Sequence, residues 1–433
     1  MPERPGGILP VRTAGTARSA PPVRPVRLAW PVWFVTRAAL LLCVLGALPF
    51  PGPDVTADVS VIYRGWYETL RTGVFPAGDV TWQYPPAAAL AILSPAALPF
   101  LPYTEAFFLL ILFCDAAVLA LLRYAGGRPG RSSRGLRVWI AGVPLLGPTG
   151  YARYDLMVTA VAVAALLAAA RSPRAFGALA AAGALLKVWP VLLLAGAAPG
   201  RPLRRALTAA VAAAAGTTLI LAAAMPGALG FLTAQRDRGT EVESLGALVF
   251  HAARHFGWEG GPALNHGSVE FIGPGVRLVS ALALALTLAA LGWLAVWRLR
   301  AREFGAATAA DAAFAAVTLF TVTSRVISPQ YLLWLVGLAA VCLTFRETRM
   351  TLPAALVLAA TGVTVLEFPV WFAHVVASDP LGVSLLVVRN GLLVAAAVTA
   401  CVRLWRGTVP DRDRRARLVS RRAGRAGTPA TRP

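Results

Sequence analysis

The sequence has 433 residues, of which 57% are hydrophobic and only 14% are charged, and its mean hydropathy is +0.66. These values exclude a soluble globular domain, in which about 25% of the residues are charged. The formal net charge of +21 does not indicate nucleic-acid binding, because the arginines gather at the chain ends and between apolar runs, as positive-inside bias and anionic lipid headgroups favour. We expect membrane lipids and no nucleic acid among the partners.

The apolar runs predict helices. Many approach or exceed the roughly 18 to 20 apolar residues that a helix needs to cross a bilayer. They are continuous and rich in alanine and leucine, whereas β-barrel strands alternate apolar and polar residues. The sequence therefore predicts an all-α, polytopic membrane protein. Its transmembrane domain is expected over residues 30–405, between basic cytoplasmic tails at 1–29 and 406–433 that are expected to be disordered.

The first apolar run covers about 30–50 and follows Arg24 and Arg27, so it is expected to run outward from the cytoplasm. The polar stretch 51–83 then lies outside the membrane. Within it, apolar residues recur at helical spacing, which predicts an amphipathic helix at the membrane surface that ends at Gly73. These residues are Val59, Ile62, Tyr63, Trp66, Tyr67 and Leu70.

Further apolar segments bring the expected number of transmembrane helices to about twelve. They lie near 85–101, 104–124, 138–149, 150–170, 175–198, 206–225, 273–297, 308–323, 330–346, 350–367 and 382–403. An even number places both tails in the cytoplasm, together with the arginine-rich loops that follow 198, 297 and 346. The longest external loop, about 226–272, has room for no more than a small cap.

One group of arginines conflicts with twelve full spans, because it would then lie outside: Arg128, Arg131, Arg134, Arg171 and Arg174. An alternative makes 85–101 and 175–198 re-entrant or broken segments, which keeps this group inside. The prolines of these two segments make that alternative physically reasonable. The sequence leaves both schemes open.

Asp58 stands at the start of the amphipathic helix, near the outer end of the first membrane helix. A carboxylate there can act as a general base at an external active site. The alternative is a helix cap or a solvated loop acid. The next external feature, Trp82-Gln-Tyr-Pro-Pro86, is either a proline-defined helix start or a binding segment.

The external stretch Gln235–Ser244 carries Arg236 and Arg238, which in an irregular loop can both bind one phosphate. Alternatively, they form ion pairs with the acidic residues of the same stretch. A third external polar segment contains Arg325. His251, His255 and His266 do not suggest a metal site, because His251-Ala-Ala-Arg-His255 lacks the glutamate of a zinc-protease motif. No metal and no cofactor are expected.

Lys187 is the only lysine of the chain and lies within the apolar segment 175–198. Arginine snorkels to the membrane interface equally well and is used everywhere else. A compact ammonium that must meet an anion in a tight pocket is a reason to keep lysine. Snorkelling of Lys187 remains the alternative.

Together, several of these features resemble glycosyltransferase family 87. The likeness rests on the external acid, Tyr84-Pro-Pro86, Lys187-x-x-Pro190, Arg236-x-Arg238 with Glu243-Ser244, and Ser328-Pro-Gln-Tyr-x-x-Trp334. It extends over about 30–405. Members often carry histidines in the last of these segments, where Gln330 and Tyr331 stand here.

The resemblance implies a GT-C-like helical bundle that transfers a sugar, usually mannose, with inversion from a polyprenyl-phosphate donor to a glycolipid or glycan acceptor on the outer face of the cell membrane. By position, Asp58 matches the catalytic base, and the donor phosphate is expected at Lys187, Arg236, Arg238 and Arg325. Substrate binding is expected at Tyr63, Glu68, Tyr84, Glu243 and Gln330. The alternative function is a transporter or flippase of polyprenyl-linked sugars.

Overall fold

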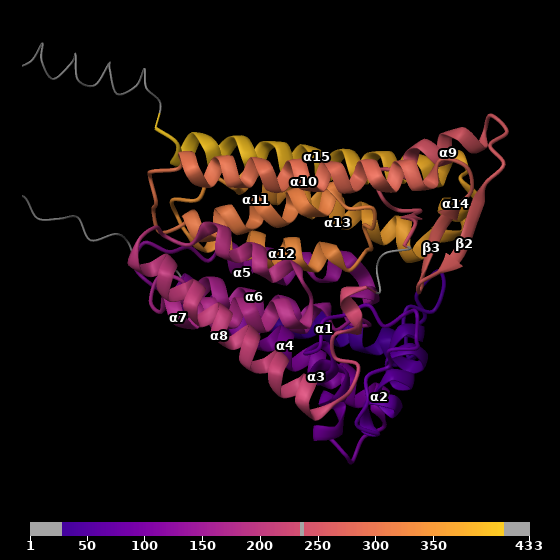
Figure 1. Cartoon of the computed structure of the whole chain (residues 1–433), viewed down its shortest axis with the longest axis horizontal. Helices are drawn as coiled ribbons and strands as arrows, with labels where there is room; N and C mark the ends of the chain where they lie inside the picture. The colour runs from indigo at the N-terminus through magenta and orange to yellow at the C-terminus, as the bar shows by residue number, and fades with distance from the viewer. Residues whose placement is uncertain (1–27, 234–237, 411–433) are drawn as a thin grey trace, which may run out of the picture.

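The structure is a computed structural model that describes residues 28–233 and 238–410. Most of each expected tail lies outside these residues. Arg236 also lies outside them. The described chain is mostly helical, as the sequence predicts (Figure 1). Its α-helices are α1 (Ala29–Val44), α2 (Arg64–Arg71), α3 (Ala88–Leu93), α4 (Tyr103–Gly126), α5 (Arg134–Gly142), α6 (Asp155–Ala168), α7 (Pro173–Leu186), α8 (Arg201–Ala224), α9 (Leu248–Arg254), α10 (Val276–Arg300), α11 (Thr308–Thr323), α12 (Tyr331–Thr344), α13 (Thr351–Val365), α14 (Phe372–Ala377) and α15 (Pro380–Thr408).

Short 3₁₀ or π-helical turns extend several of these helices. They are η1 (Asp58–Tyr63), η2 (Ser94–Ala97), η3 (Pro144–Gly150), η4 (Trp189–Gly196), η5 (Gly230–Leu232) and η6 (Leu366–Val370). A small antiparallel sheet has the strand order β1-β3-β2, with β1 (Thr240–Glu241), β2 (Gly261–Asn265) and β3 (Ser268–Ile272).

Helix α12 forms the centre of the bundle. Each of its residues from Leu332 to Thr344 is buried, as expected for a helix that is apolar all round. It packs against α5 and α6 as well as against α11 and α13. At Gly337 a Cβ atom would lie only 2.4 Å from Thr159 of α6, so the absent side chain permits this close approach.

Five helices of the described chain are long and apolar enough to cross a membrane: α4, α8, α10, α13 with its extension η6, and α15. The other apolar helices, such as α1, α6, α7, α11 and α12, have 10 to 17 residues. The expectation of about twelve spanning helices is therefore not confirmed. The mostly helical fold and the membrane-length apolar helices are consistent with the predicted all-α membrane class.

The arginine-rich loops meet at one end of the bundle. Arg131 forms an antiparallel β-bridge with Phe345, and the Ser132 amide donates to the Thr344 carbonyl at 2.8 Å. The loop after α4 therefore lies beside the loop after α12. Twelve full spans would put these two loops at opposite ends, whereas the alternative with a re-entrant segment 85–101 puts them together. In the structure this segment forms only the short α3 and η2.

The segment 175–198 is a hairpin rather than a span. Helix α7 ends where Lys187 adopts an extended backbone conformation, and Pro190 cannot continue the helix. The returning η4 packs back on α7, since Pro190 lies against Gly183. Pro173 and Ala198, at the two bases of the hairpin, both line a small cavity at the arginine-rich end. The hairpin tip, with Lys187, points toward the opposite end.

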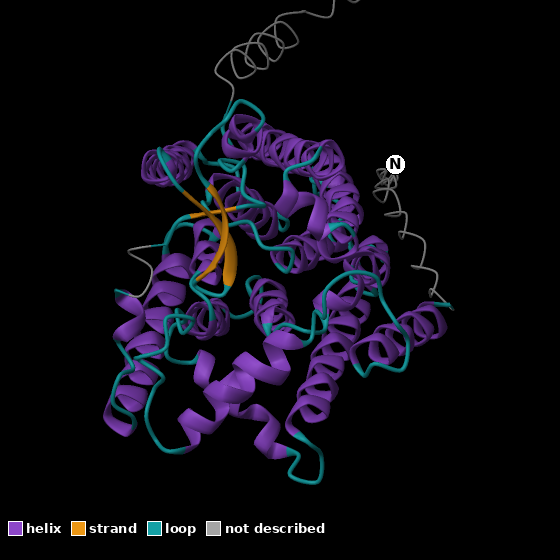
Figure 2. Cartoon of the chain, turned by 90° about the vertical axis from the view of Figure 1, so that its right-hand side faces the viewer, coloured by secondary structure: helices purple, strands orange, loops and turns teal. Residues whose placement is uncertain are grey.

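That opposite end carries the predicted external segments. A helix is present where the amphipathic pattern predicts one, as η1 continues into α2, but its buried residues Val59, Tyr63, Trp66 and Leu70 face the protein. The loop after α8 forms the small cap, made of α9 and the three strands. Figure 2, which looks at this end, shows the strands crossing over the ends of the helices. The turn between β2 and β3 has positive φ at His266 (50°) and Gly267 (75°), which suits a two-residue hairpin.

A buried ion pair ties the first helices together. Arg37 of α1 donates from Nε to Asp115 of α4 at 2.8 Å, and both side chains are at most 1% exposed. Asp115 also accepts hydrogen bonds from Trp33, Trp139 and Tyr151 at 2.7 to 2.9 Å. Each oxygen of this carboxylate is bonded, so we interpret the cluster as a structural connection between α1, α4, α5 and η3.

We expect Asp115→Asn to destabilise the protein strongly, because it leaves the Arg37 guanidinium buried without a counter-charge. Breaking a buried pair in this way costs about 3–5 kcal/mol. Thermal unfolding of the detergent-solubilised protein measures the effect, with Cys114→Ala at the neighbouring position as control. An unchanged melting temperature for Asp115→Asn would contradict a structural role for the pair.

Candidate active site

A cavity of about 440 Å³ opens beneath the cap, at the end of the bundle opposite the arginine-rich loops. Its walls come from η1, the loop before α3, the tip of the α7–η4 hairpin, the turn between β2 and β3, and the segment between α11 and α12. Most residues predicted for the site line this one cavity: Asp58, Tyr63, Tyr84, Lys187, Arg238, Arg325 and Gln330. An acid and three basic side chains from distant parts of the sequence are thereby brought together.

Asp58 is the first residue of η1, and its side chain is 32% exposed. One of its oxygens lies 3.0 Å from Nε of Arg153, whose side chain is 10% exposed. Arg153 is itself anchored, since its Nη1 donates to the carbonyl of Val55 at 2.9 Å and to that of Ala152 at 2.7 Å. The acid is therefore held by an ion pair and still faces the cavity.

Lys187 lies at the hairpin tip, with its Nζ 2.7 Å from Oδ1 of Asp155. Four aromatic rings surround the ammonium at 5.1 to 5.6 Å, those of Tyr84, Tyr154, Tyr331 and Trp334. Rings at this distance attract a cation by their electron-rich faces. The side chain is only 12% exposed and ends inside the bundle, so snorkelling to a membrane interface does not describe it.

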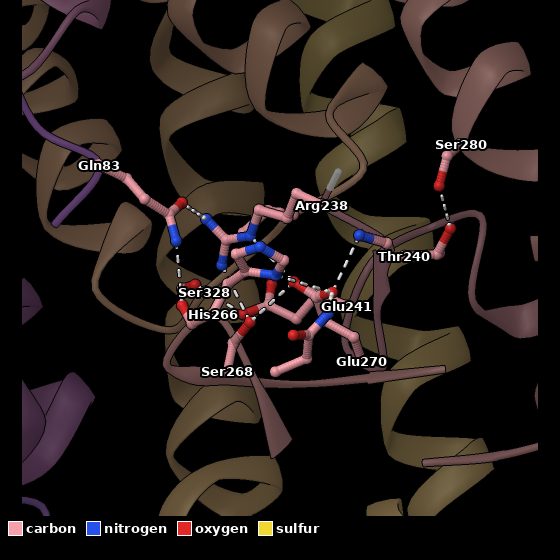
Figure 3. A network of polar contacts seen from close by, with 12 residues as sticks. Gln83, Arg238, Thr240, Glu241, His266, Ser268, Glu270, Ser280 and Ser328 are labelled. Atoms are coloured by element: carbon pink, nitrogen blue, oxygen red, sulfur yellow. Dashed lines mark hydrogen bonds and ion pairs between the residues drawn. The ribbon is translucent and has the colours of Figure 1, made fainter. Parts of the chain in front are cut away.

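Arg238 stands at the centre of a polar network that joins the cap to the loop before α3 (Figure 3). It donates from Nε to Glu270 at 3.0 Å, from Nη1 to Gln83 at 3.1 Å and from Nη2 to Ser268 at 2.9 Å. Gln83 in turn donates to the carbonyl of His266 at 3.2 Å. These bonds fix the guanidinium in position at the cavity wall.

Glu241 holds the segment that carries Arg325 and Gln330. Its carboxylate accepts from the amide of Ile327 at 2.7 Å and from the hydroxyl of Ser328 at 2.8 Å. Burial raises the pKa of Glu241, although the nearby Arg238 opposes this. Burial and the charge of Arg238 both lower the pKa of Arg325. Arg238, which is paired with Glu270, and Arg325 thus place two positively charged groups at the wall of the same cavity.

Asp79 orients an aromatic residue of the cavity wall. Its Oδ2 accepts from Nε1 of Trp66 at 2.8 Å, and its Oδ1 accepts from the amide and the hydroxyl of Thr81. Burial opposes ionisation of Asp79, but the bonds from Thr81 and Trp66 outweigh it and lower the pKa. The Trp66 ring stacks on Tyr63 with 5.3 Å between centroids.

Two residues expected to bind substrate do not line the cavity. Glu68 is exposed on α2, 3.8 Å from Arg71, because it occupies the polar face of that helix. Glu243 is buried in a separate cluster, where Arg389 donates to its backbone carbonyl and to the Glu367 carboxylate. Burial and the charge of Glu367 raise the pKa of Glu243. Arg236 lies outside the described residues.

Other residues at the cavity were not named as site residues from the sequence, although Gln83 and Trp334 stand in segments that the sequence analysis identified. Arg153, Asp155, Gln83, His266 and Trp334 either line the cavity or bond directly to residues that do. The sequence could have indicated Arg153 and Asp155 as functional residues. They are opposite charges two residues apart between apolar runs, where ionisable residues are costly. His266 had no such indication in the sequence, because its place depends on how the cap folds.

Comparison with known proteins agrees with the resemblance. The model of glycosyltransferase family 87 matches residues 82–329, which is more than half of the chain. This range includes Lys187, Arg238 and Arg325 but begins after Asp58. No curated protein matches the sequence. Because the family match covers more than half of the chain, the chain belongs to glycosyltransferase family 87.

Proposed function

We propose that this membrane glycosyltransferase moves a sugar, mannose, from a polyprenyl-phosphate donor to a glycolipid or glycan acceptor at the outer face of the cell membrane. The observation that carries the proposal is the shared cavity, in which Asp58 and the cations Lys187, Arg238 and Arg325 all face one space. A base and fixed positive charges are what the transfer requires.

In the proposed reaction, Asp58 accepts the proton of the acceptor hydroxyl as its oxygen attacks the anomeric carbon of the donor sugar. The bond between that carbon and the phosphate oxygen breaks, and the electron pair leaves with the polyprenyl phosphate. Lys187, Arg238 and Arg325 stabilise the negative charge that develops on this phosphate. In-line attack inverts the anomeric centre, so a β-linked donor gives an α-linked product.

The charge distribution supports the proposed orientation. The arginine-rich loops gather at the end opposite the cavity, and positive-inside bias favours that end in the cytoplasm. The cavity then opens at the outer face, which gives the acid and the cations access to substrates outside the cytoplasm. Both tails are proposed to be cytoplasmic.

The proposed reaction predicts a new glycolipid when sealed vesicles that contain the protein receive polyprenyl phosphate carrying radiolabelled mannose. The label is expected to move into an acceptor lipid that separates from the donor on thin-layer chromatography. Vesicles with Asp58→Asn protein serve as control. Label that crosses the membrane on an unmodified donor would instead favour a transporter or flippase of polyprenyl-linked sugars.

A further inference from the structure

The segment Arg153-Tyr154-Asp155 connects the two functional halves of the cavity. It runs from the turn after η3 into the first residue of α6, and its two charged residues stand two positions apart. Each pairs with an opposite charge from elsewhere in the chain, Arg153 with Asp58 and Asp155 with Lys187. The proposed base and the proposed phosphate-binding cation are thus both held by one three-residue segment.

Arg153 fixes the start of η1 as well as the acid itself. Its guanidinium pairs with Asp58 and donates to the carbonyl of Val55, three residues before that acid. Its own bond to the carbonyl of Ala152 limits the freedom of the side chain. Because backbone and carboxylate are both held, Asp58 has little scope to turn away from the cavity.

Asp155 fixes the ammonium of Lys187 in position from behind the cavity wall. It is 1% exposed, and its Oδ1 accepts from Nζ of Lys187 and from Nε1 of Trp334, both at 2.7 Å. It is also the first residue of the 14-residue helix α6, where the helix dipole favours a negative charge. Tyr154, between the two charged residues, contributes one of the rings around Lys187.

We propose that Arg153 and Asp155 are positioning residues that set the separation between the general base and the phosphate-binding lysine. This inference rests on the proposed function, in which Asp58 and Lys187 have those roles. Asp155 does not touch the substrate, since it lies behind Lys187 and Trp334. The segment also supplies a counter-charge to the largely buried Lys187, which removes the large cost of burying that charge alone.

The kinetic test compares Arg153→Gln and Asp155→Asn in proteoliposomes with the mannose donor. Arg153→Gln is expected to lower kcat by about 100-fold with little change in the donor KM, because a small displacement of the base slows the chemical step. Asp155→Asn is expected mainly to raise the donor KM, because Lys187 is no longer held. Asp155→Glu keeps the charge and is expected to recover part of the affinity.

Asp379→Asn is the matched control. Asp379 caps α15 through the amide of Gly382 and lies outside the cavity, so its loss is expected to leave kcat and KM unchanged. If the segment has a purely structural role, both variants lose the same amount of active protein. The protein that remains folded then has the kcat and KM of the wild type. That result would overturn the proposal.

Lys187 offers a second test that needs no turnover, because it is the only lysine of the chain. Reductive methylation with ¹³C-formaldehyde labels Lys187 and the amino terminus alone, and the two signals are resolved by NMR. Asp155→Asn is expected to shift the lysine signal, whereas Asp379→Asn is expected to leave it in place. An unshifted signal in Asp155→Asn would overturn the positioning role, while a wild-type protein that transfers no sugar would count against the proposed function instead.

Discussion

Asp58→Asn is expected to abolish sugar transfer while leaving the protein folded, because the pair of Asp58 with Arg153 is partly exposed and its loss costs less than that of the fully buried Arg37–Asp115 pair. Asparagine keeps the size of the side chain but cannot accept the proton of the acceptor hydroxyl. General-base catalysis contributes about 10² to 10⁴-fold to a rate, so kcat is expected to fall by that factor. The measurement is the initial rate of mannose transfer in proteoliposomes supplied with polyprenyl-phosphate mannose.

Asp54→Asn is the matched control for this variant. Asp54 is exposed four residues earlier in the same loop, and its carboxylate accepts from the amide and hydroxyl of Thr56 rather than facing the cavity. It is expected to transfer mannose at the wild-type rate. Undiminished transfer by Asp58→Asn would remove Asp58 from the mechanism.

Lys187→Met is expected to weaken donor binding. Methionine fills a similar volume within the four rings but supplies no charge to the phosphate. Loss of a hydrogen bond to a charged group costs about 1.5–3 kcal/mol, which corresponds to a rise of about 10- to 100-fold in the dissociation constant. The apparent donor KM and the binding of radiolabelled polyprenyl phosphate by purified protein both report this change.

The partner of Lys187 requires its own control. Lys187→Met leaves Asp155 buried without a counter-charge, which destabilises the fold in addition to weakening binding. The double variant Lys187→Met, Asp155→Asn removes both charges and is expected to recover thermal stability but not donor affinity. An unaltered donor affinity in either variant would show that Lys187 does not contact the phosphate.

The structure explains why lysine is kept at this one position. The ammonium fits between four aromatic rings and bonds to Asp155 at 2.7 Å. A guanidinium is planar and larger, and its fork of donors needs several acceptors that this cage does not offer. The same cage would orient Lys187 toward the cavity, where the proposed phosphate lies.

The hydropathy of the sequence predicts where helices lie, but it does not predict which of them span the membrane. The apolar runs identified almost all of the helical segments, because a membrane requires apolar residues that satisfy their backbone hydrogen bonds within the helix. Hydropathy alone did not separate a spanning helix from a hairpin at 175–198. That distinction depends on Pro190 packing against Gly183 and on where the two bases of the hairpin lie.

The candidate site was predicted in part. Asp58, Lys187 and Arg325 stand in or near apolar segments, Arg238 stands in the charged external stretch 235–244, and all four line one cavity. Glu243 belongs to the same charged stretch as Arg238 but turns into a separate buried cluster with Arg389. The local sequence of the loop does not specify the direction in which each side chain points.

By itself, the sequence determined the membrane character, the predominantly helical class and the family, since these follow from local apolar runs and from the order of short motifs. Only the tertiary structure decided which charges pair. Arg153 and Asp58 are far apart in the sequence, as are Asp155 and Lys187, and each pair forms because helix packing brings its members within 3.0 Å. A buried charge needs a partner of opposite sign, but the identity of that partner is a property of the packed bundle.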